Sequence, residues 1–301
     1  MDRFDAMRVF CRVVERRSFT RAAEDLGLPR SSVTDAVKEL ENRLGARLLQ
    51  RTTRHVSPTL DGEAHYQRCL RLIADLEDAE GAFAGAKPRG PLHVDVHGTL
   101  AGHFVVPHLP GFLAEYPDIE LFLSEGDRYV DLVREGVDCA LRVGDLTDSD
   151  LVARRLAALE EATCASPSYI ARHGTPRDPD SLDGHRMVGF RSSATGGVLP
   201  LEFTVAGGEV RRVSLPSSVA VSGAETYAAA ARAGLGLIQS PRYRLEADFR
   251  RGSLVPVLPE TPPTRTPVSV LYPRGKHLSP RLRVFIDWLS GRFRAEAAAT
   301  G

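Results

Sequence analysis

The sequence contains no long hydrophobic run and no excess of charge of either sign. No apolar stretch approaches the roughly 18 residues that a membrane-spanning helix needs, which argues against a membrane protein. Lysine and arginine together number 39, as do aspartate and glutamate, so net charge does not indicate a nucleic-acid partner. The N-terminal MDRFDAMRVF is charged and amphipathic, unlike an export signal. We therefore expect a soluble, cytoplasmic protein with no membrane partner.

Cysteine is scarce: only four are present, and none belongs to a C-x-x-C pair. Each lies in an apolar pattern, which indicates a buried free thiol in a reducing compartment and not a disulfide or metal site. These residues are Cys11, Cys69, Cys139 and Cys164.

The sequence also lacks the local motifs of common enzymes. It has no glycine-rich phosphate loop, no G-x-S-x-G turn and no recognisable cysteine nucleophile motif. His93, Asp95 and His97 share one face of a predicted strand. A metal site could use that spacing, but a polar strand face is the simpler interpretation. We predict no catalytic residue, no metal site and no cofactor.

What the sequence does contain is a strong local pattern between residues 18 and 60. Two short amphipathic helical segments are separated by Gly27, Leu28 and Pro29. Ser18 or Thr20 can cap the first of them, and Gly27 can adopt the positive φ of a tight turn. Pro29 suits the first turn of the next helix. The expected buried faces are Phe4, Met7, Cys11 and Val14 on a preceding helix, and Val33, Val37, Leu40 and Leu44 on the last one.

The exposed face of that last helix carries basic and hydroxyl side chains. The N-terminal residues of such a helix reach base edges in the major groove of DNA, and Arg30 is the best candidate for a bidentate contact to guanine. Asp35 would accept a bond from cytosine, or pair with Lys38 or a neighbouring arginine. A basic stretch without acids follows over residues 42–60, as expected of a wing that contacts phosphates. The predicted DNA-binding residues are Arg30, Ser31, Ser32, Thr34, Lys38, Arg51, Thr52 and Arg54.

A long helix is predicted from Thr59 to about Gly85. Its apolar residues repeat at heptad spacing, which predicts a short seam made by Tyr66, Cys69, Ile73, Leu76 and Phe83. We favour a dimerisation helix, because recognition of two DNA half-sites needs two reading heads. The alternative is a helix packed on its own domain. Residues 86–91, AKPRGP, then break the helix and predict a hinge.

Strand-like and helical segments alternate after the hinge, a rhythm typical of a mostly parallel sheet with helices on both faces. They divide into one lobe of residues 91–162 plus 266–297 and a second lobe of residues 163–265. Ligands of such sheets bind at the carboxyl ends of strands, which include Thr99, Leu100, Glu125, Arg142 and Ser192. Ser222 and Glu225 would form a capping box. Helix N-termini at Thr99 and Ser222 favour an anionic or oxygen-rich small effector.

The order of these features resembles the LysR-type transcriptional regulators over essentially the whole chain. The resemblance is carried by Phe10, SFTRAA at 18–23, Ser31-Ser32-Val33-Thr34, Leu40-Glu41, Leu44-Gly45, Arg51-Thr52-Thr53-Arg54, Thr59 and Gly62.

The resemblance implies a fold that combines α and α/β parts. A winged helix-turn-helix would occupy residues 1–59, and a dimerising linker helix with its hinge residues 60–90. Residues 91–297 would form a two-lobed α/β effector domain similar to periplasmic binding proteins. The resemblance further implies a homodimer or homotetramer on promoter DNA and leaves RNA polymerase open as a partner. The implied effector-binding residues are Thr99, Leu100, Arg142, Ser192, Ser222 and Ile238.

Two other classes of function remain to be separated from this one. A small-molecule-binding protein or enzyme could carry an incidental helix-turn-helix. An architectural nucleoid protein would bind DNA without an effector and without preference for one upstream site.

Overall fold

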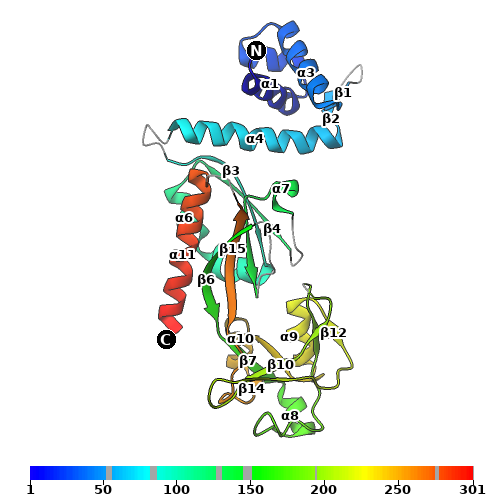
Figure 1. Ribbon diagram of the computed structural model, residues 1–301, viewed down its shortest axis with the longest axis vertical. Helices are drawn as coiled ribbons and strands as arrows, with labels where there is room; N and C mark the ends of the chain where they lie inside the picture. The colour runs from blue at the N-terminus through cyan, green and yellow to red at the C-terminus, as the bar shows by residue number, and fades with distance from the viewer. Residues whose placement is uncertain are drawn as a thin grey trace.

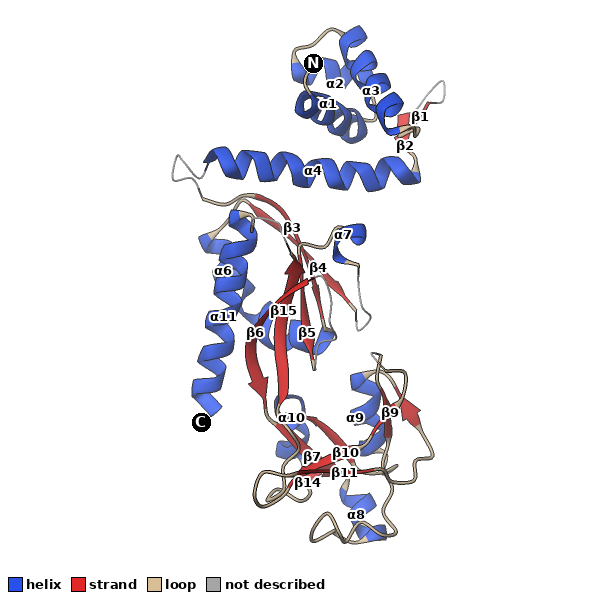
Figure 2. Ribbon diagram, in the orientation of Figure 1, coloured by secondary structure: helices blue, strands red, loops and turns tan. Residues whose placement is uncertain are grey.

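The computed structural model describes residues 1–51, 56–81, 87–126, 131–144, 151–193, 195–274 and 278–300. Figure 1 shows its parts in sequence along the longest axis: an N-terminal helical domain, a long helix α4 across the molecule, and two α/β lobes. The C-terminal helix α11 runs along the side of the first lobe. Figure 2 shows the helices of that lobe in blue around its central sheet in red.

The N-terminal domain is a helix-turn-helix followed by a short β-ribbon. Ser18 caps the second helix by accepting from the Arg21 N–H at 3.3 Å, and Gly27 ends it with φ 63°. Both predictions are confirmed. Pro29 precedes the third helix as its N-cap and does not enter its first turn. The elements are α1 (Arg3–Arg16), α2 (Phe19–Leu26), α3 (Arg30–Leu44), β1 (Leu49–Arg51) and β2 (Val56–Pro58).

The core of this domain differs from the predicted faces at the ends of two helices. Phe4 and Leu44 are 38% and 45% exposed, because the start of α1 and the end of α3 extend past the packed centre. The stripe on α1 is instead centred on Val9, Phe10 and Val13, which are all buried.

Helix α4 (Leu60–Gly81) packs on its own DNA-binding domain. Cys69 is fully buried there, and Tyr66 and Ile73 lie against the same hydrophobic core. Part of the predicted seam therefore packs within the chain, as the alternative to a dimerisation helix expected, and the role of α4 as a dimer surface stays a prediction. Leu72, 45% exposed, lies outside that core. Phe83 lies outside the described residues.

The first lobe is built on a five-stranded sheet with order β4-β3-β5-β15-β6. Strand β3 runs parallel to β4 and β5, but β15 runs antiparallel to β5 and β6. The expected mostly parallel sheet is thus only half correct, because β15 enters from the second lobe and returns against its neighbours. The strands are β3 (Gly90–Val96), β4 (Ile119–Glu125), β5 (Cys139–Val143), β6 (Leu151–Leu159) and β15 (Thr266–Pro273).

Helices cover both sides of this sheet, with α6 and α11 on one side and α7 on the other (Figure 1). Phe112 and Phe285 pack edge to face in the core, with ring centroids 5.5 Å apart. The helical segments are α5 (Gly98–Leu100), a π-helix (Ala101–Val105), a 3₁₀ turn (Val106–His108), α6 (Leu109–Glu115), α7 (Leu132–Glu135) and α11 (Pro280–Thr300).

The second lobe holds smaller sheets, with α8 and α9 on opposite sides of its strands (Figure 2). The predicted hairpin is confirmed by the antiparallel pair β10–β11. The predicted capping box is wrong: α9 begins after Gly223 and has no side-chain cap. The elements are β7 (Glu161–Ala165), α8 (Pro167–His173), β8 (Gly189–Arg191), β9 (Val198–Leu199), β10 (Leu201–Thr204), β11 (Val210–Val213), β12 (Ala220–Val221), α9 (Ala224–Arg232), β13 (Ile238–Pro241), α10 (Arg242–Arg251) and β14 (Val255–Pro256).

Two sequence expectations concern the whole chain. All four cysteines are buried and free, as predicted. Among the helices that the structure describes, none is both long and apolar enough to cross a membrane.

Candidate nucleic-acid interface and interlobe pocket

The outward face of α3 presents basic groups that are not used inside the protein. Arg30 and Lys38 are exposed, and neither forms an ion pair with the residues that the structure describes. Ser31 is exposed, whereas Ser32 and Thr34 are half-buried. The Thr34 hydroxyl donates to the Arg30 carbonyl at 3.0 Å, which leaves its oxygen as an acceptor. This face can therefore offer both charge and hydrogen bonds to a ligand in a groove.

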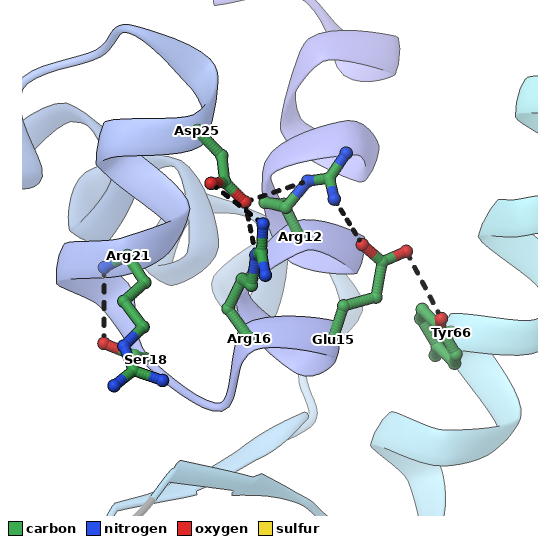
Figure 3. Close-up of polar contacts among 7 residues, drawn as sticks. All are labelled: Arg12, Glu15, Arg16, Ser18, Arg21, Asp25 and Tyr66. Carbon is green, nitrogen blue, oxygen red and sulfur yellow. Dashed lines mark hydrogen bonds and ion pairs between the residues drawn. The ribbon is translucent and has the colours of Figure 1, made fainter.

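Some arginines elsewhere in the domain are neutralised internally, and Figure 3 shows two of them, Arg12 and Arg16 of α1. Arg16 Nε donates to Asp25 at 2.5 Å, and Arg12 pairs with Glu15 at 3.0 Å. The hydrogen bond from Arg16 lowers the pKa of Asp25. The Tyr66 hydroxyl of α4 donates to Glu15 at 3.4 Å and so joins the linker helix to this cluster. The free positive charge of the domain is thereby left on surfaces such as α3.

The wing residues predicted to contact phosphates are only partly described. Arg51 ends β1, and β1 pairs with β2 through Gln50 and Ser57. Thr52 and Arg54 lie outside the described residues, as does the side chain of Arg51. Their roles therefore stay predictions.

A pocket of about 680 Å³ lies between the two lobes. The first lobe contributes the segment from His97 to His103 together with Glu125, and the second contributes the start of α9 and the first residues of α10. Its volume falls within the range of about 300–1,000 Å³ that small-molecule sites occupy. The pocket is thus large enough for a metabolite.

Tyr243 of α10 joins the lobes at this pocket. Its hydroxyl donates to Thr99 Oγ1 at 3.0 Å, and Thr99 also hydrogen-bonds His97 Nδ1 at 3.0 Å. The Tyr243 ring lies 4.6 Å from that of His103. A ligand that rearranges these groups would alter the contact between the lobes.

The predicted effector residues fall in different places. Thr99 lines the pocket, and Ser222 is exposed next to the lining residue Gly223. Leu100 and Ile238 are fully buried in the cores of the first and second lobes, so their predicted side-chain contacts with an effector are corrected.

Arg142 and Ser192 do not belong to the pocket wall. Arg142 forms an ion pair with Asp95 inside the first lobe. Ser192 Oγ accepts from the Thr195 N–H at 3.3 Å in a turn of the second lobe.

The strand end at Glu125, expected from the sequence, lines the pocket, whereas sequence reasoning missed Tyr243 and Arg244. The usable signal was the carboxyl end of β13, because Arg242 directly follows Pro241 there. The prediction chose Ile238 at the start of that strand, where the side chain turns inward.

The polar strand face of β3 is engaged in hydrogen bonds. His93 Nε2 lies 2.8 Å from Ser124 Oγ, and that hydroxyl donates to Asp95 at 2.6 Å. Burial lowers the pKa of His93. No group of three or more metal-ligating side chains occurs in the part of the chain that the structure describes. This arrangement matches the predicted polar face.

Side-chain contacts join the chain segments that cross between the two lobes. Thr266 at the start of β15 donates to Glu161 at 2.6 Å, and Arg265 pairs with Glu160 at 2.7 Å. Burial raises the pKa of Glu161 to about 7. A titratable carboxyl thus lies where the chain passes from one lobe to the other.

Glu161 should make stability depend on pH. Because its folded-state pKa is raised, its contribution is fully present below the ordinary pKa of 4.5 and is lost as the pH rises through about 7. Between about pH 5 and about pH 8 the wild type should lose about 2 kcal/mol more stability than Glu161→Gln. Urea unfolding across this window measures the difference. Glu160→Gln, at the exposed neighbour, should give a profile parallel to wild type, and a parallel Glu161→Gln profile would contradict the assignment.

A winged helix-turn-helix joined by a long helix to a two-lobed binding domain defines a class of transcription regulators. A family model described as "Bacterial regulatory helix-turn-helix protein, lysR family" matches residues 4–63. Another, described as "LysR substrate binding domain", matches residues 85–294. The chain belongs to the LysR family of transcriptional regulators.

Individual relatives agree with this assignment. The chain is 38% identical over 294 residues to the uncharacterized HTH-type transcriptional regulator YhjC of Escherichia coli K12, over 97% of this chain and 98% of that protein. It resembles the solved structure of CrgA, a LysR-type regulator from Neisseria meningitidis, with TM-score 0.59 and 34% identity over 96% and 98% of the two chains. Full-length AphB, a virulence activator of Vibrio cholerae, matches with TM-score 0.58 and 27% identity over 96% and 99%. The predicted fold class and regulator function are confirmed.

Proposed function

We propose that this regulator reads operator DNA in the cytoplasm as a homodimer or homotetramer, through Arg30, Ser31, Ser32, Thr34 and Lys38 on α3. The observation that carries this proposal is the uncompensated charge of Arg30 and Lys38 beside neutralised arginines on α1. Phosphate neutralisation supplies affinity, and base-edge contacts supply specificity. Arg51, Thr52 and Arg54 of the wing would add phosphate contacts, and RNA polymerase is a further proposed partner.

We further propose that a small molecule in the interlobe pocket controls this binding. Tyr243 and Thr99 join the lobes there, and α4 carries the DNA-binding domain on the first lobe. A ligand can shift the arrangement of the reading heads only if it binds one arrangement more tightly than another. Any effect of the ligand on DNA affinity therefore equals an effect of DNA on ligand affinity.

The direct test is equilibrium binding to the DNA upstream of the protein's own coding region. Fluorescence anisotropy with scrambled competitor, at low and high salt, separates specific from non-specific binding. Tight binding that resists the competitor supports a sequence-specific regulator. Binding that the competitor abolishes would instead favour an architectural protein or an operator located elsewhere.

Arg30 and Lys38 should contribute in different ways. Arg30→Ala should cost about 1–3 kcal/mol at one base position and relax the preference there. Lys38→Ala should weaken binding to all sequences alike and lower the slope of log affinity against log salt by about one unit. Competition against operators substituted at single positions measures the first effect, and a salt titration measures the second. Equal losses on every sequence for Arg30→Ala would remove its base-reading role.

A further inference from the structure

The interlobe pocket has walls of opposite charge. On the second lobe, the guanidinium of Arg244 lies beside the N-terminus of α9, and on the first lobe the carboxylate of Glu125 stands over Gly98. We infer that the pocket binds a small zwitterion of the amino-acid class, an inference that rests on the proposed effector control of this regulator. Its carboxylate would face Arg244 and α9, and its ammonium group would face Glu125.

The second-lobe wall is prepared for a carboxylate. The Arg244 side chain is only 10% exposed, and its buried Nε–H has no acceptor in the described structure. Its other nitrogens reach Ser240 at 2.9 Å and the exposed Glu225 at 3.5 Å. Next to it, α9 starts at Gly223 without a side-chain cap, so its first N–H groups face the pocket without an internal acceptor side chain. Unsatisfied N–H groups and a helix dipole favour an anionic group at this position.

The first-lobe wall is prepared for a cation. Glu125 is exposed at the end of β4 and forms no ion pair with the described residues. A Cβ at Gly98 would lie 2.7 Å from Glu125 Oε2, so the glycine leaves room for this carboxylate against the start of α5. Apart from the histidines His97 and His103, the titratable lining that supports this charge count consists of two carboxylates, Glu125 and Glu225, and one guanidinium. A simple anion would add to the negative excess, whereas an ammonium group offsets it.

The experiment uses the full chain and isothermal titration calorimetry. The common L-amino acids are screened by thermal shift, and the best ligand is compared with its amide and with its analogue lacking the amino group. Each analogue should bind at least about tenfold more weakly, because each leaves one charged partner unsatisfied. Equal binding of the analogue without the amino group, or no binding by any amino acid, would overturn the inference.

Variants assign the two walls. Glu125→Gln should weaken the amino acid at least about tenfold but leave the analogue without the amino group unchanged. Glu120→Gln, on the exposed face of the same strand, is the matched control and should change neither. Arg244→Gln should weaken both ligands. Unchanged amino-acid affinity in Glu125→Gln would overturn the assignment of that wall.

A second variant of the second-lobe wall keeps the inference testable if Arg244→Gln fails to fold. Gly223 has φ −98°, and a Cβ there would meet only Thr226 Oγ1 at 3.7 Å, so Gly223→Asp fits the backbone. Its carboxylate would cap α9 and occupy the anion position. It should bind the amino acid at least about tenfold more weakly while melting no lower than wild type.

This inference and the proposed function fail separately. A carboxylic acid without an amino group that binds the pocket and changes DNA affinity would refute the zwitterion but leave the regulator intact. Absence of specific operator binding would refute the proposed regulator function but would leave the amino-acid affinity measured by calorimetry unchanged.

Discussion

Gly62→Ala should destabilise the DNA-binding half of the protein by about 3 kcal/mol or more. A Cβ at position 62 would lie 1.8 Å from the Leu48 carbonyl oxygen and 2.8 Å from its carbon. That carbonyl cannot move freely, because it accepts from the Thr59 N–H at 2.9 Å. The Leu48 N–H in turn donates to Glu41 at 2.8 Å. The helix start must therefore separate from the segment that leads into the wing.

Gly291→Ala is the matched control. Gly291 lies inside helix α11, and a Cβ there would meet nothing within 4 Å. The same substitution should stabilise the chain by about 0.5–1 kcal/mol, because alanine favours a helix interior. Urea unfolding followed by circular dichroism compares the two. If Gly62→Ala lost less than about 0.5 kcal/mol, the close approach of α4 to Leu48 would be refuted.

The features that the sequence predicted well are local ones. Helix α2 begins at the cap of Ser18 and ends at the positive φ of Gly27, and neighbouring residues alone determine both features. The buried positions of α3 follow from helical spacing, and Val33, Val37 and Leu40 are indeed buried. Because the α3 residues proposed to face DNA lie opposite that stripe, the same spacing places them on the outward face of the helix.

The features that it missed depend on contacts between distant segments. Heptad spacing identified the apolar side of α4, but spacing cannot tell whether that side meets a second chain or, as Cys69 does, helix α1. The strand-end rule pointed to the correct pocket edge, yet it could not distinguish Ile238 from Tyr243, because burial depends on how β13 pairs with β7. The ion pair between Arg281 and Asp75 joins residues 206 positions apart, so no local sequence pattern predicts it.

Arg281→Met should cost about 3 kcal/mol and weaken the link between the linker helix and the first lobe. The Arg281 side chain is 1% exposed, donates to the Pro91 carbonyl at 2.8 Å and pairs with Asp75 of α4 at 2.7 Å. Removal of the guanidinium leaves that carbonyl and Asp75 without this partner. Urea unfolding measures the loss. Arg283→Met, on the exposed side of α11, should change stability by less than about 0.5 kcal/mol.

A double-mutant cycle with Asp75→Asn isolates the pair itself. If the ion pair carries the link, the two substitutions should be non-additive by about 1 kcal/mol or more, and additive losses would contradict it. From the position of the pair we also predict a role in regulation. Pro91 lies on β3, and that strand ends one residue before His97 in the pocket, while Asp75 lies on the helix that carries the DNA-binding domain. Arg281→Met should therefore shrink the change in DNA affinity that a pocket ligand produces, although it touches neither ligand nor DNA. An unchanged ligand effect in the folded variant would mean that the lobes communicate with α4 through other contacts.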